Sequence, residues 1–223
     1  VIKMKKFKIK IFSDGANLDS IIADNKKKFI SGFTTNPSLM AKAKISDYKK
    51  FGHKICQKVK KKHLSFEVIS DDHQNILKEA KIISNFGNNA FVKIPIVNSK
   101  GSSNLKSIAA CCELGIKLNI TAVFTNKQVK SIFDCTKNYK SKVIISIFAG
   151  RIADTGRDAS YVISNAIKLV KNQKRYEVLW ASTREVYNIY QAEKLGCHII
   201  TVTSDILSKL KLYNKDLLKY SKE

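Results

Sequence analysis

Short apolar segments recur along the whole chain, and each is followed by polar residues and then by a longer stretch with helical spacing. The segments show little strict alternation of apolar and polar residues. This pattern is typical of strands that are buried on both faces, as in a parallel sheet. We predict eight strands: Lys8–Phe12, Ile30–Phe33, Leu64–Val68, Phe91–Ile94, Lys117–Ile120, Val143–Phe148, Val178–Trp180 and Ile199–Val202.

Amphipathic segments between these strands predict helices. The clearest are Asp47–Val59, Ile76–Phe86, Ala159–Val170 and Arg184–Leu195. In the last segment, one helical face would carry Val186, Ile189, Tyr190 and Leu195. Gly196 follows directly and is typical of a helix end.

Eight strand–helix units in one chain favour an α/β fold with a single (β/α)8 TIM barrel over residues 1–223. The alternative, a doubly wound open sheet, usually has fewer strands and a glycine-rich turn after the first strand. Asp14-Gly15-Ala16-Asn17 is not such a turn. We interpret residues 1–5 as a non-standard start or an added remnant, and residues from about 204 to 223 as a helical tail.

The composition narrows the class of protein. The 223 residues are 44% apolar, which is enough for a full core and excludes collagen, disorder and disulfide miniproteins. No stretch approaches the roughly 18 apolar residues of a membrane helix, so no membrane partner is expected. Five cysteines without CxxC spacing indicate reduced thiols in a cytoplasm, and the four histidines are not arranged around them as metal ligands.

A net charge of +23 raises the question of nucleic-acid binding. The lysines recur on most predicted helices and loops, and no basic run alternates with aromatic residues, so we predict a solvated lysine coat and no nucleic-acid partner. Arg151, Arg157 and Arg184 sit in two compact motifs, with only Arg175 outside them. This placement favours bidentate recognition of phosphate or carboxylate; the alternatives are structural ion pairs and chance, since the chain has only four arginines.

In a barrel, the active site lies where the strands end at their carboxyl side. Those ends carry an acid, an amine, a second acid, amides, hydroxyls and two arginines. Taken singly, each is explained as a loop residue or helix cap, but the set points to one site. Its members are Asp14, Thr34, Thr35, Asn36, Glu67, Lys93, Asn119, Thr121, Ser146, Arg151, Ser182, Arg184, Thr201 and Thr203.

Lys93 is the one lysine flanked on both sides by a sustained apolar run. Burial lowers a lysine pKa, and a neutral amine can attack a carbonyl to form a Schiff base. The alternative is a lysine that lies in a strand by chance and extends out of its end. Pro95 places the strand end just after Lys93, because proline does not fit the middle of a central strand.

Four motifs follow one another along the chain: Gly32-Phe33-Thr34-Thr35-Asn36-Pro37-Ser38, Phe91-Val92-Lys93-Ile94-Pro95, Asn119-Ile120-Thr121 and Phe148-Ala149-Gly150-Arg151-Ile152. In this order they resemble the transaldolase family of class I aldolases, in its small branch that includes fructose-6-phosphate aldolases. The resemblance runs from Lys8 to about Leu217.

The resemblance implies a catalytic set without metal or cofactor. Lys93 would form the Schiff base with a ketose, and Glu67 with Thr121 would hold the water that shuttles protons. Asp14 would take the proton of the substrate C4 hydroxyl. The alternatives are a helix cap for Asp14 and an ion pair with Lys93 for Glu67.

The resemblance also implies a sugar-phosphate site and a homo-oligomer assembled through the C-terminal helix, for which the tail after Leu218 is short. Asn36, Asn119 and Ser146 would hold hydroxyls of the three-carbon fragment, with Thr35 and Phe148 beside it. Arg151, Ser182 and Arg184 would hold the phosphate; for Ser182, helix capping is the alternative.

Two residues bear on the reaction. Fructose-6-phosphate aldolases typically have glutamine at the position of Glu67 and tyrosine at that of Phe148, and a tyrosine hydroxyl could protonate the carbanion. Both residues here favour a transaldolase that transfers dihydroxyacetone between sugar phosphates; an aldolase that releases dihydroxyacetone is the alternative. A more distant alternative function is that of a non-catalytic basic protein that binds nucleic acid. Arg157 is a candidate extra phosphate contact or an ion-pair partner of Asp154 or Asp158.

Overall fold

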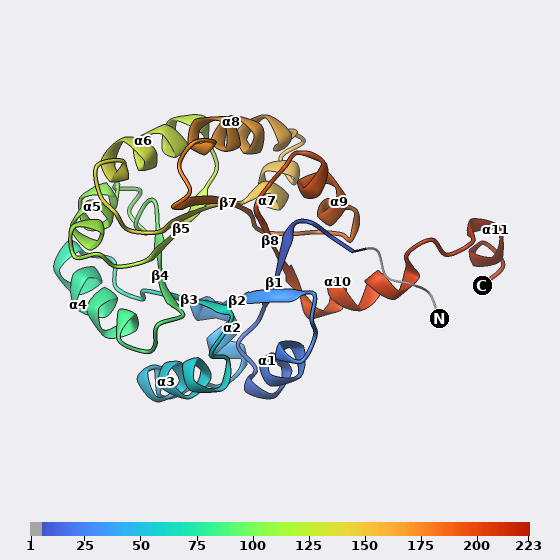
Figure 1. Cartoon of the computed structure of the whole chain (residues 1–223), viewed down its shortest axis with the longest axis horizontal. Helices are drawn as coiled ribbons and strands as arrows, with labels where there is room; N and C mark the ends of the chain where they lie inside the picture. The colour runs from blue at the N-terminus through green and yellow to red at the C-terminus, as the bar shows by residue number, and fades with distance from the viewer. Residues whose placement is uncertain (1–5) are drawn as a thin grey trace.

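The computed structural model describes residues 6–223 and contains a closed barrel of eight parallel strands (Figure 1). Each strand pairs with the next, and β8 closes the barrel on β1. The predicted TIM barrel is confirmed, and the alternative of an open sheet is wrong. The expectation for residues 1–5 lies outside the described residues. The strands are β1 Lys10–Asp14, β2 Ile30–Thr34, β3 His63–Glu67, β4 Ala90–Pro95, β5 Leu118–Val123, β6 Val143–Ile147, β7 Tyr176–Trp180 and β8 Ile199–Thr203.

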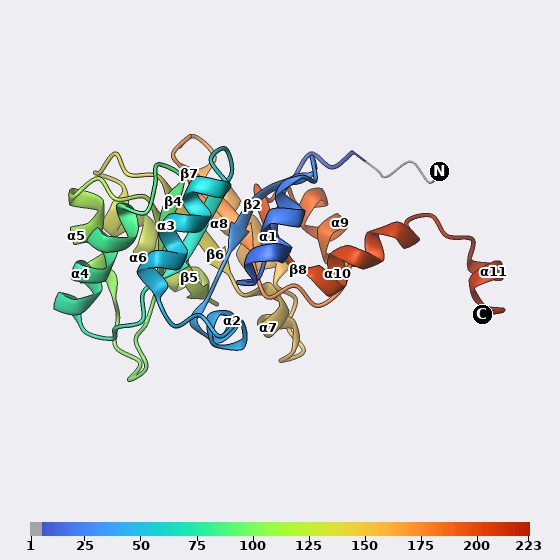
Figure 2. The same cartoon turned by 90° about the horizontal axis from the view of Figure 1, so that it is seen from below.

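Helices surround the barrel in a ring (Figure 1). Two short ones, α2 and α7, project from the same end of the barrel (Figure 2). The helices are α1 Leu18–Asn25, α2 Pro37–Lys42, α3 Tyr48–Lys58, α4 His73–Ser84, α5 Leu105–Glu113, α6 Asn126–Thr136, α7 Ala149–Ala153, α8 Ser160–Val170, α9 Tyr187–Lys194, α10 Ser204–Ser208, the 3-10 helix η1 Lys209–Leu212 and α11 Leu217–Tyr220.

The helix predicted over Arg184–Leu195 begins later than expected, at Tyr187. The side-chain oxygen of Asn188 accepts hydrogen bonds from the backbone N–H groups of Arg184 and Glu185, at 2.9 and 3.1 Å. These bonds hold the segment as a loop. As a result Arg184 stays at the end of the barrel instead of joining the helix. The predicted stop at Gly196 is confirmed, since its φ of +78° is a left-handed conformation that glycine adopts without strain.

Alternate strand residues face different surroundings, as the pleat requires. One set packs against the helices in the main apolar core, for example Ile11, Phe33 and Val92. The other set faces the barrel interior, where Phe12, Phe91, Ile144, Leu179 and Ile199 form a second, smaller apolar cluster with Ala181. Gly32 makes room for this cluster, because a Cβ there would lie 2.6 Å from the Phe12 ring.

The barrel interior is therefore layered along its axis. Polar side chains such as Asp14 and Lys93 face a pocket at the carboxyl ends of the strands. The small apolar cluster fills the middle. Charged and imidazole side chains, among them Lys10, His63 and Glu177, line a second cavity at the amino ends. The apolar layer separates the two cavities.

After β8 the chain leaves the barrel through α10 and η1, and α11 stands clear of it (Figures 1 and 2). Leu217 and Leu218 of α11 are 79% and 70% exposed. Within residues 6–223, no helix combines the length and the apolar character that crossing a membrane requires. The five cysteines are free thiols, and all but Cys135 are buried.

Candidate active site

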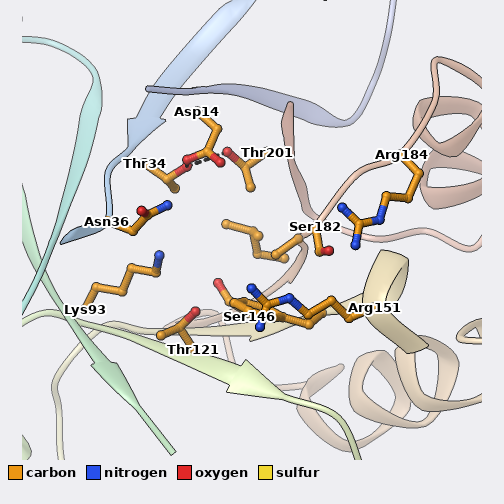
Figure 3. A pocket seen from close by; sticks show the side chains of 13 residues that line it. Asp14, Thr34, Asn36, Lys93, Thr121, Ser146, Arg151, Ser182, Arg184 and Thr201 are labelled. Carbon is orange, nitrogen blue, oxygen red and sulfur yellow. Dashed lines mark hydrogen bonds between the residues drawn. The ribbon is translucent and has the colours of Figure 1, made fainter. Parts of the chain in front are cut away.

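A polar pocket of about 200 Å³ opens at the carboxyl ends of the strands (Figure 3). It combines an amine, a carboxylate, five hydroxyl groups on strands or loops and two guanidinium groups. Strands from all around the barrel contribute to it. The lining residues are Asp14, Thr34, Asn36, Lys93, Thr121, Ser146, Phe148, Arg151, Leu179, Ala181, Ser182, Arg184 and Thr201.

Lys93 reaches into this pocket from β4, and it is only 7% exposed. Its Nζ lies 2.9 Å from a carboxylate oxygen of Glu67 on the neighbouring strand β3. It also donates a hydrogen bond to the backbone oxygen of Thr35 at 3.2 Å. The pairing follows from the strand register, in which Glu67 and Lys93 are direct partners. The ion pair with Lys93 that was the alternative role predicted for Glu67 is thus present.

Asp14 ends β1 opposite Lys93 and belongs to a chain of hydroxyl groups. The hydroxyl of Thr34 donates to its carboxylate at 2.7 Å, and the hydroxyls of Thr34 and Thr201 lie 2.5 Å apart. Because Thr34 has one proton to donate, Thr201 is the donor in the second bond. Burial raises the pKa of Asp14, while Lys93 and Thr34 act in the opposite direction. Asp14 does not cap a helix; Asn17 caps α1.

The hydroxyl of Thr121 is buried and has no hydrogen-bond partner among the described residues, although it lines the pocket. A buried hydroxyl without a partner is costly, so this group is suited to bind a substrate atom or water. Nearby, the Asn119 side chain bridges two serines: it donates to Ser65 at 3.0 Å and accepts from Ser146 at 2.6 Å. Ser146 faces the pocket, whereas Asn119 supports it from behind.

Arg151 and Arg184 reach the pocket from α7 and from the loop after β7 (Figure 3). The Arg151 guanidinium lies over the Phe148 ring, 5.1 Å from its centre. Arg184 pairs with the exposed carboxylate of Asp154 through two nitrogens, with Nε 3.3 Å from Oδ1. Both arginines therefore point their charges toward one side of the pocket.

Ser182 lies between these arginines with a φ of +61°, which is unusual for a residue with a Cβ. It does not cap a helix. The turn is packed against the start of α7, where a Cβ on Gly150 would lie 1.6 Å from the Ser182 backbone oxygen. Glycine at position 150 is what allows the two loops to approach this closely.

Four predicted residues do not line this pocket: Thr35, Glu67, Asn119 and Thr203. Thr35 turns its hydroxyl to the backbone oxygen of Ser65, at 3.0 Å, and contributes its own carbonyl to Lys93. Glu67 lies behind Lys93. Asn36 caps α2 with its side-chain oxygen and presents its amide nitrogen to the pocket (Figure 3).

Arg157 does not line the pocket; its guanidinium bonds to the hydroxyl of Thr155 at 3.2 Å. The carboxylate of Asp154 pairs with Arg184 instead. The sequence placed Thr34 and Thr201 among the strand-end residues of the site without a specific role, and it indicated Asp154 only as a possible ion-pair partner of Arg157. Their signal was only their place at strand ends or in the loop after β6, which does not specify hydrogen-bond partners. Within residues 6–223, no group of three or more His, Cys, Asp or Glu side chains could hold a metal ion.

Comparison with known proteins decides the family. The family model described as transaldolase/fructose-6-phosphate aldolase matches residues 11–222. The chain belongs to this family. A probable transaldolase of Thermoanaerobacter sp. (strain X514) is 34% identical over 203 residues, covering 91% of this chain and 89% of that protein. A probable transaldolase of Nitrosopumilus maritimus (strain SCM1) is 32% identical over 204 residues, covering 91% and 87%. Membership supports an enzyme of the aldolase or transaldolase type.

Solved structures show the same barrel. A 3-hexulose-6-phosphate synthase matches with a TM-score of 0.62 at 14% identity, covering 91% of this chain and 97% of that one. KGPDC from Streptococcus mutans matches with a TM-score of 0.60 at 10% identity, covering 90% of each chain. At these identities the likeness establishes the fold alone.

Proposed function

We propose that this protein is a transaldolase that moves a dihydroxyacetone unit from a ketose phosphate to an aldose phosphate through a Schiff base on Lys93. One observation carries the proposal: a buried lysine amine, next to a carboxylate, faces a pocket that also holds two arginines. A carbonyl carbon bound in that pocket is within reach of the amine, and a phosphate is within reach of the guanidinium groups.

The first step requires an amine with a free electron pair. Glu67 takes a proton from the Lys93 ammonium, and the amine nitrogen then attacks the C2 carbonyl to give a carbinolamine. Glu67 returns a proton to the departing hydroxyl, so that water leaves and an iminium ion forms. The Thr121 hydroxyl is placed to hold this water, since it lines the pocket and has no partner among the described residues.

Asp14 then acts as the base for carbon–carbon cleavage. Its carboxylate takes the proton of the C4 hydroxyl, the C3–C4 bond breaks, and its electrons move into the iminium to give an enamine. The aldose phosphate leaves, and a second aldehyde enters to run these steps in reverse. The hydroxyl chain from Thr201 through Thr34 orients the Asp14 carboxylate toward the substrate.

Phosphate binding follows from the two arginines, because a guanidinium group offers a planar pair of donors to phosphate oxygens. Arg151 and Arg184 take this role, with Ser182 between them. Asn36 and Ser146 hold hydroxyl groups of the three-carbon fragment, and Asn119 fixes the Ser146 hydroxyl.

Phe148 favours transfer over release of dihydroxyacetone. Its ring lines the pocket and has no hydroxyl that could protonate the enamine. The enamine therefore persists until an aldehyde acceptor arrives. The aldolase that releases dihydroxyacetone is the competing activity, and its requirement for a nearby proton donor separates the two.

The test is acceptor dependence. The protein is incubated with fructose 6-phosphate, with and without erythrose 4-phosphate, and products are followed together with borohydride trapping. We expect rapid formation of glyceraldehyde 3-phosphate and sedoheptulose 7-phosphate only when the acceptor is present. Equal release of free dihydroxyacetone in both reactions would replace the transaldolase assignment with the aldolase one.

We also propose a cytoplasmic homo-oligomer. Free cysteines are suited to a reducing compartment. The exposed leucines of α11, held away from the barrel, are suited to contact a neighbouring copy. Sedimentation of the whole chain and of a Leu217→Ser/Leu218→Ser variant tests this assembly, and a wild-type monomer would contradict it.

A further inference from the structure

The lysine coat is uneven along the barrel axis. The loops that lead from a helix into the next strand, at residues 26–29, 59–62, 85–89, 114–117, 137–142, 171–175 and 195–198, hold 13 lysine or arginine residues and no acid. The loops on the catalytic side, at 15–17, 35–36, 43–47, 68–72, 96–104, 124–125, 148, 154–159 and 181–186, hold four cations and six acids. Positive charge is thus concentrated at the amino ends of the strands.

A cavity of about 340 Å³ lies on this basic face, at the mouth of the barrel opposite the active site. It is lined by five cations, Lys10, Lys142, Lys171, Lys174 and Arg175, and by one carboxylate, Glu177. That carboxylate is 2.7 Å from Lys10, so the lining keeps an excess of four positive charges.

The cations at this cavity are not explained by helix ends alone. Lysine is favoured near helix C-termini because of the helix dipole. Lys10, however, is the first residue of β1, and Lys142 directly precedes β6. The amino groups of Lys142, Lys171 and Lys174 make no ion pair with any described residue.

Arg175 is held in place and gives the cavity a fixed positive charge. Its guanidinium donates to the backbone oxygens of Ser141, Thr136 and Lys137 at 2.8 to 3.2 Å. It also lies over the Tyr176 ring, 4.3 Å from its centre. Arg175 is therefore held in one position, whereas the side chains of Lys142, Lys171 and Lys174 are free to adjust to a ligand.

Two imidazoles complete the lining. Burial lowers the pKa of His63 and of His198, so both are neutral at neutral pH. The Nδ1 of His198 accepts a hydrogen bond from the backbone N–H of Val178 at 3.0 Å, which leaves Nε2 as an N–H donor. Phe91 and Ile144 form the apolar floor that separates this cavity from the active site.

We propose that this cavity binds a small molecule that carries two or three linked phosphate groups. A single phosphate group carries roughly −1.5 to −2 charges at pH 7, which is less than the excess of four positive charges. A diphosphate or triphosphate group matches that charge, and the three lysines without an ion-pair partner can donate to its oxygens. Inorganic polyphosphate and nucleotides share this chemistry, and the experiment below separates them.

The test is calorimetric titration of the whole chain with inorganic tripolyphosphate, with fructose 6-phosphate present at saturation to fill the active site. We expect one site per chain. Inorganic phosphate should bind more weakly. A nucleoside triphosphate that binds more tightly than tripolyphosphate identifies a nucleotide site, and equal binding identifies the phosphate chain as the whole ligand.

Two triple variants remove the same charge from the same face. The first variant, Lys142→Gln/Lys171→Gln/Lys174→Gln, removes three positive charges from the cavity lining. It should weaken tripolyphosphate binding by about tenfold or more, because charge-assisted hydrogen bonds are lost. The second variant, Lys26→Gln/Lys28→Gln/Lys60→Gln, removes three charges from the same face outside the cavity. It should change the affinity for tripolyphosphate by less than about threefold. Both variants should keep the wild-type rate with sugar phosphates.

Three results would overturn the proposal. One is the absence of tripolyphosphate binding by the wild-type chain. Another is an equal loss in both triple variants, together with tight binding of a single-stranded oligonucleotide, which would make the face a nucleic-acid surface. The last is phosphate binding as tight as that of tripolyphosphate, which would reduce the cavity to a single-phosphate site.

Discussion

The amino group of Lys93 lies 2.9 Å from the carboxylate of Glu67, across the pairing of β3 and β4. This contact joins a candidate nucleophile directly to a proton acceptor inside the barrel. A buried ion pair that served only the fold would be a weak source of stability, because removing two charges from water is costly. The pair is better explained by its chemistry, since proton transfer to Glu67 frees the amine.

Borohydride trapping tests this role of Lys93. With fructose 6-phosphate present, we expect a single reduced three-carbon adduct on Lys93, because the imine to this lysine is the species that borohydride reduces. Peptide mapping by mass spectrometry locates it. Glu67→Gln should slow adduct formation without moving it, since a neutral amide cannot take the lysine proton. An adduct on another lysine would contradict the assignment.

Phosphate recognition by Arg184 can be separated from its contact with Asp154. That ion pair is half exposed, at 50% and 52%, so it should add little to stability. Arg184→Ala should therefore leave the free energy of unfolding in urea nearly unchanged. It should weaken the binding of phosphorylated substrates by about 1.5–3 kcal/mol, and Arg151→Ala should have the same effect on binding. The readout is kcat/KM for fructose 6-phosphate.

Unphosphorylated fructose is the control substrate, because it has no phosphate for the arginines to hold and should be affected much less. Asp154→Ala is the control variant: it removes the ion pair, keeps the guanidinium, and should not weaken phosphate binding. Equal losses for fructose and fructose 6-phosphate would show that the arginines support the fold.

The order of elements was predictable because each strand of this barrel is a short apolar run, and each helix has its own spacing. All eight strands were found within a few residues of their bounds. Lys93 was identifiable because it interrupts an apolar strand. The start of α9 was missed, because the side chain of Asn188 competes with helical bonds in a way that spacing does not reveal.

The contacts among site residues were less predictable. Thr34 and Thr201 are 167 positions apart, and only the closure of β8 on β1 brings their hydroxyls together near Asp14. The concentration of lysines at one end was also missed. It depends on which loops share an end of the barrel, and an even coat is the expectation when that topology is not used.

The raised pKa of Asp14 predicts a pH-dependent cost to stability. Its ordinary value is 3.8, and burial raises the pKa in the folded protein. A raised folded pKa stabilises the fold when the group is protonated, and that contribution is lost as pH rises through the folded value. Asp14→Asn should therefore be more stable than the wild type at neutral pH. The difference should shrink as pH falls toward 3.8.

Urea unfolding at several pH values measures this difference. Asp19→Asn is the matched control, because Asp19 is exposed in the first turn of α1. It should lose a few tenths of a kcal/mol or remain unchanged, since an acid near a helix start is mildly favourable. An Asp14→Asn variant that is less stable than the wild type at neutral pH would refute the prediction.

Two glycines near the site should respond differently to alanine. At Gly150 the new Cβ would lie 1.6 Å from the Ser182 backbone oxygen, so the two loops must separate. We expect Gly150→Ala to lower the free energy of unfolding by about 1–3 kcal/mol. It should also raise the KM for phosphorylated substrates, because Arg184 lies in the same displaced loop as Ser182. At Gly15 a Cβ meets nothing within 4 Å, so Gly15→Ala should be close to neutral in the same unfolding assay.

The residue at position 148 should decide between transfer and release. Phe148 lines the pocket, with its ring 5.7 Å from that of Phe124 and in contact with Arg151. Phe148→Tyr keeps the ring and adds a hydroxyl that can donate a proton to the enamine. Free dihydroxyacetone should therefore form faster without an acceptor. Adding Glu67→Gln should raise the share of turnover that ends in free dihydroxyacetone, while it slows formation of the Schiff base. An assay of dihydroxyacetone from fructose 6-phosphate measures the shift. Phe148→Leu, which adds no hydroxyl, should not show it, and a similar increase in that variant would mean that loosened packing, rather than proton donation, controls release.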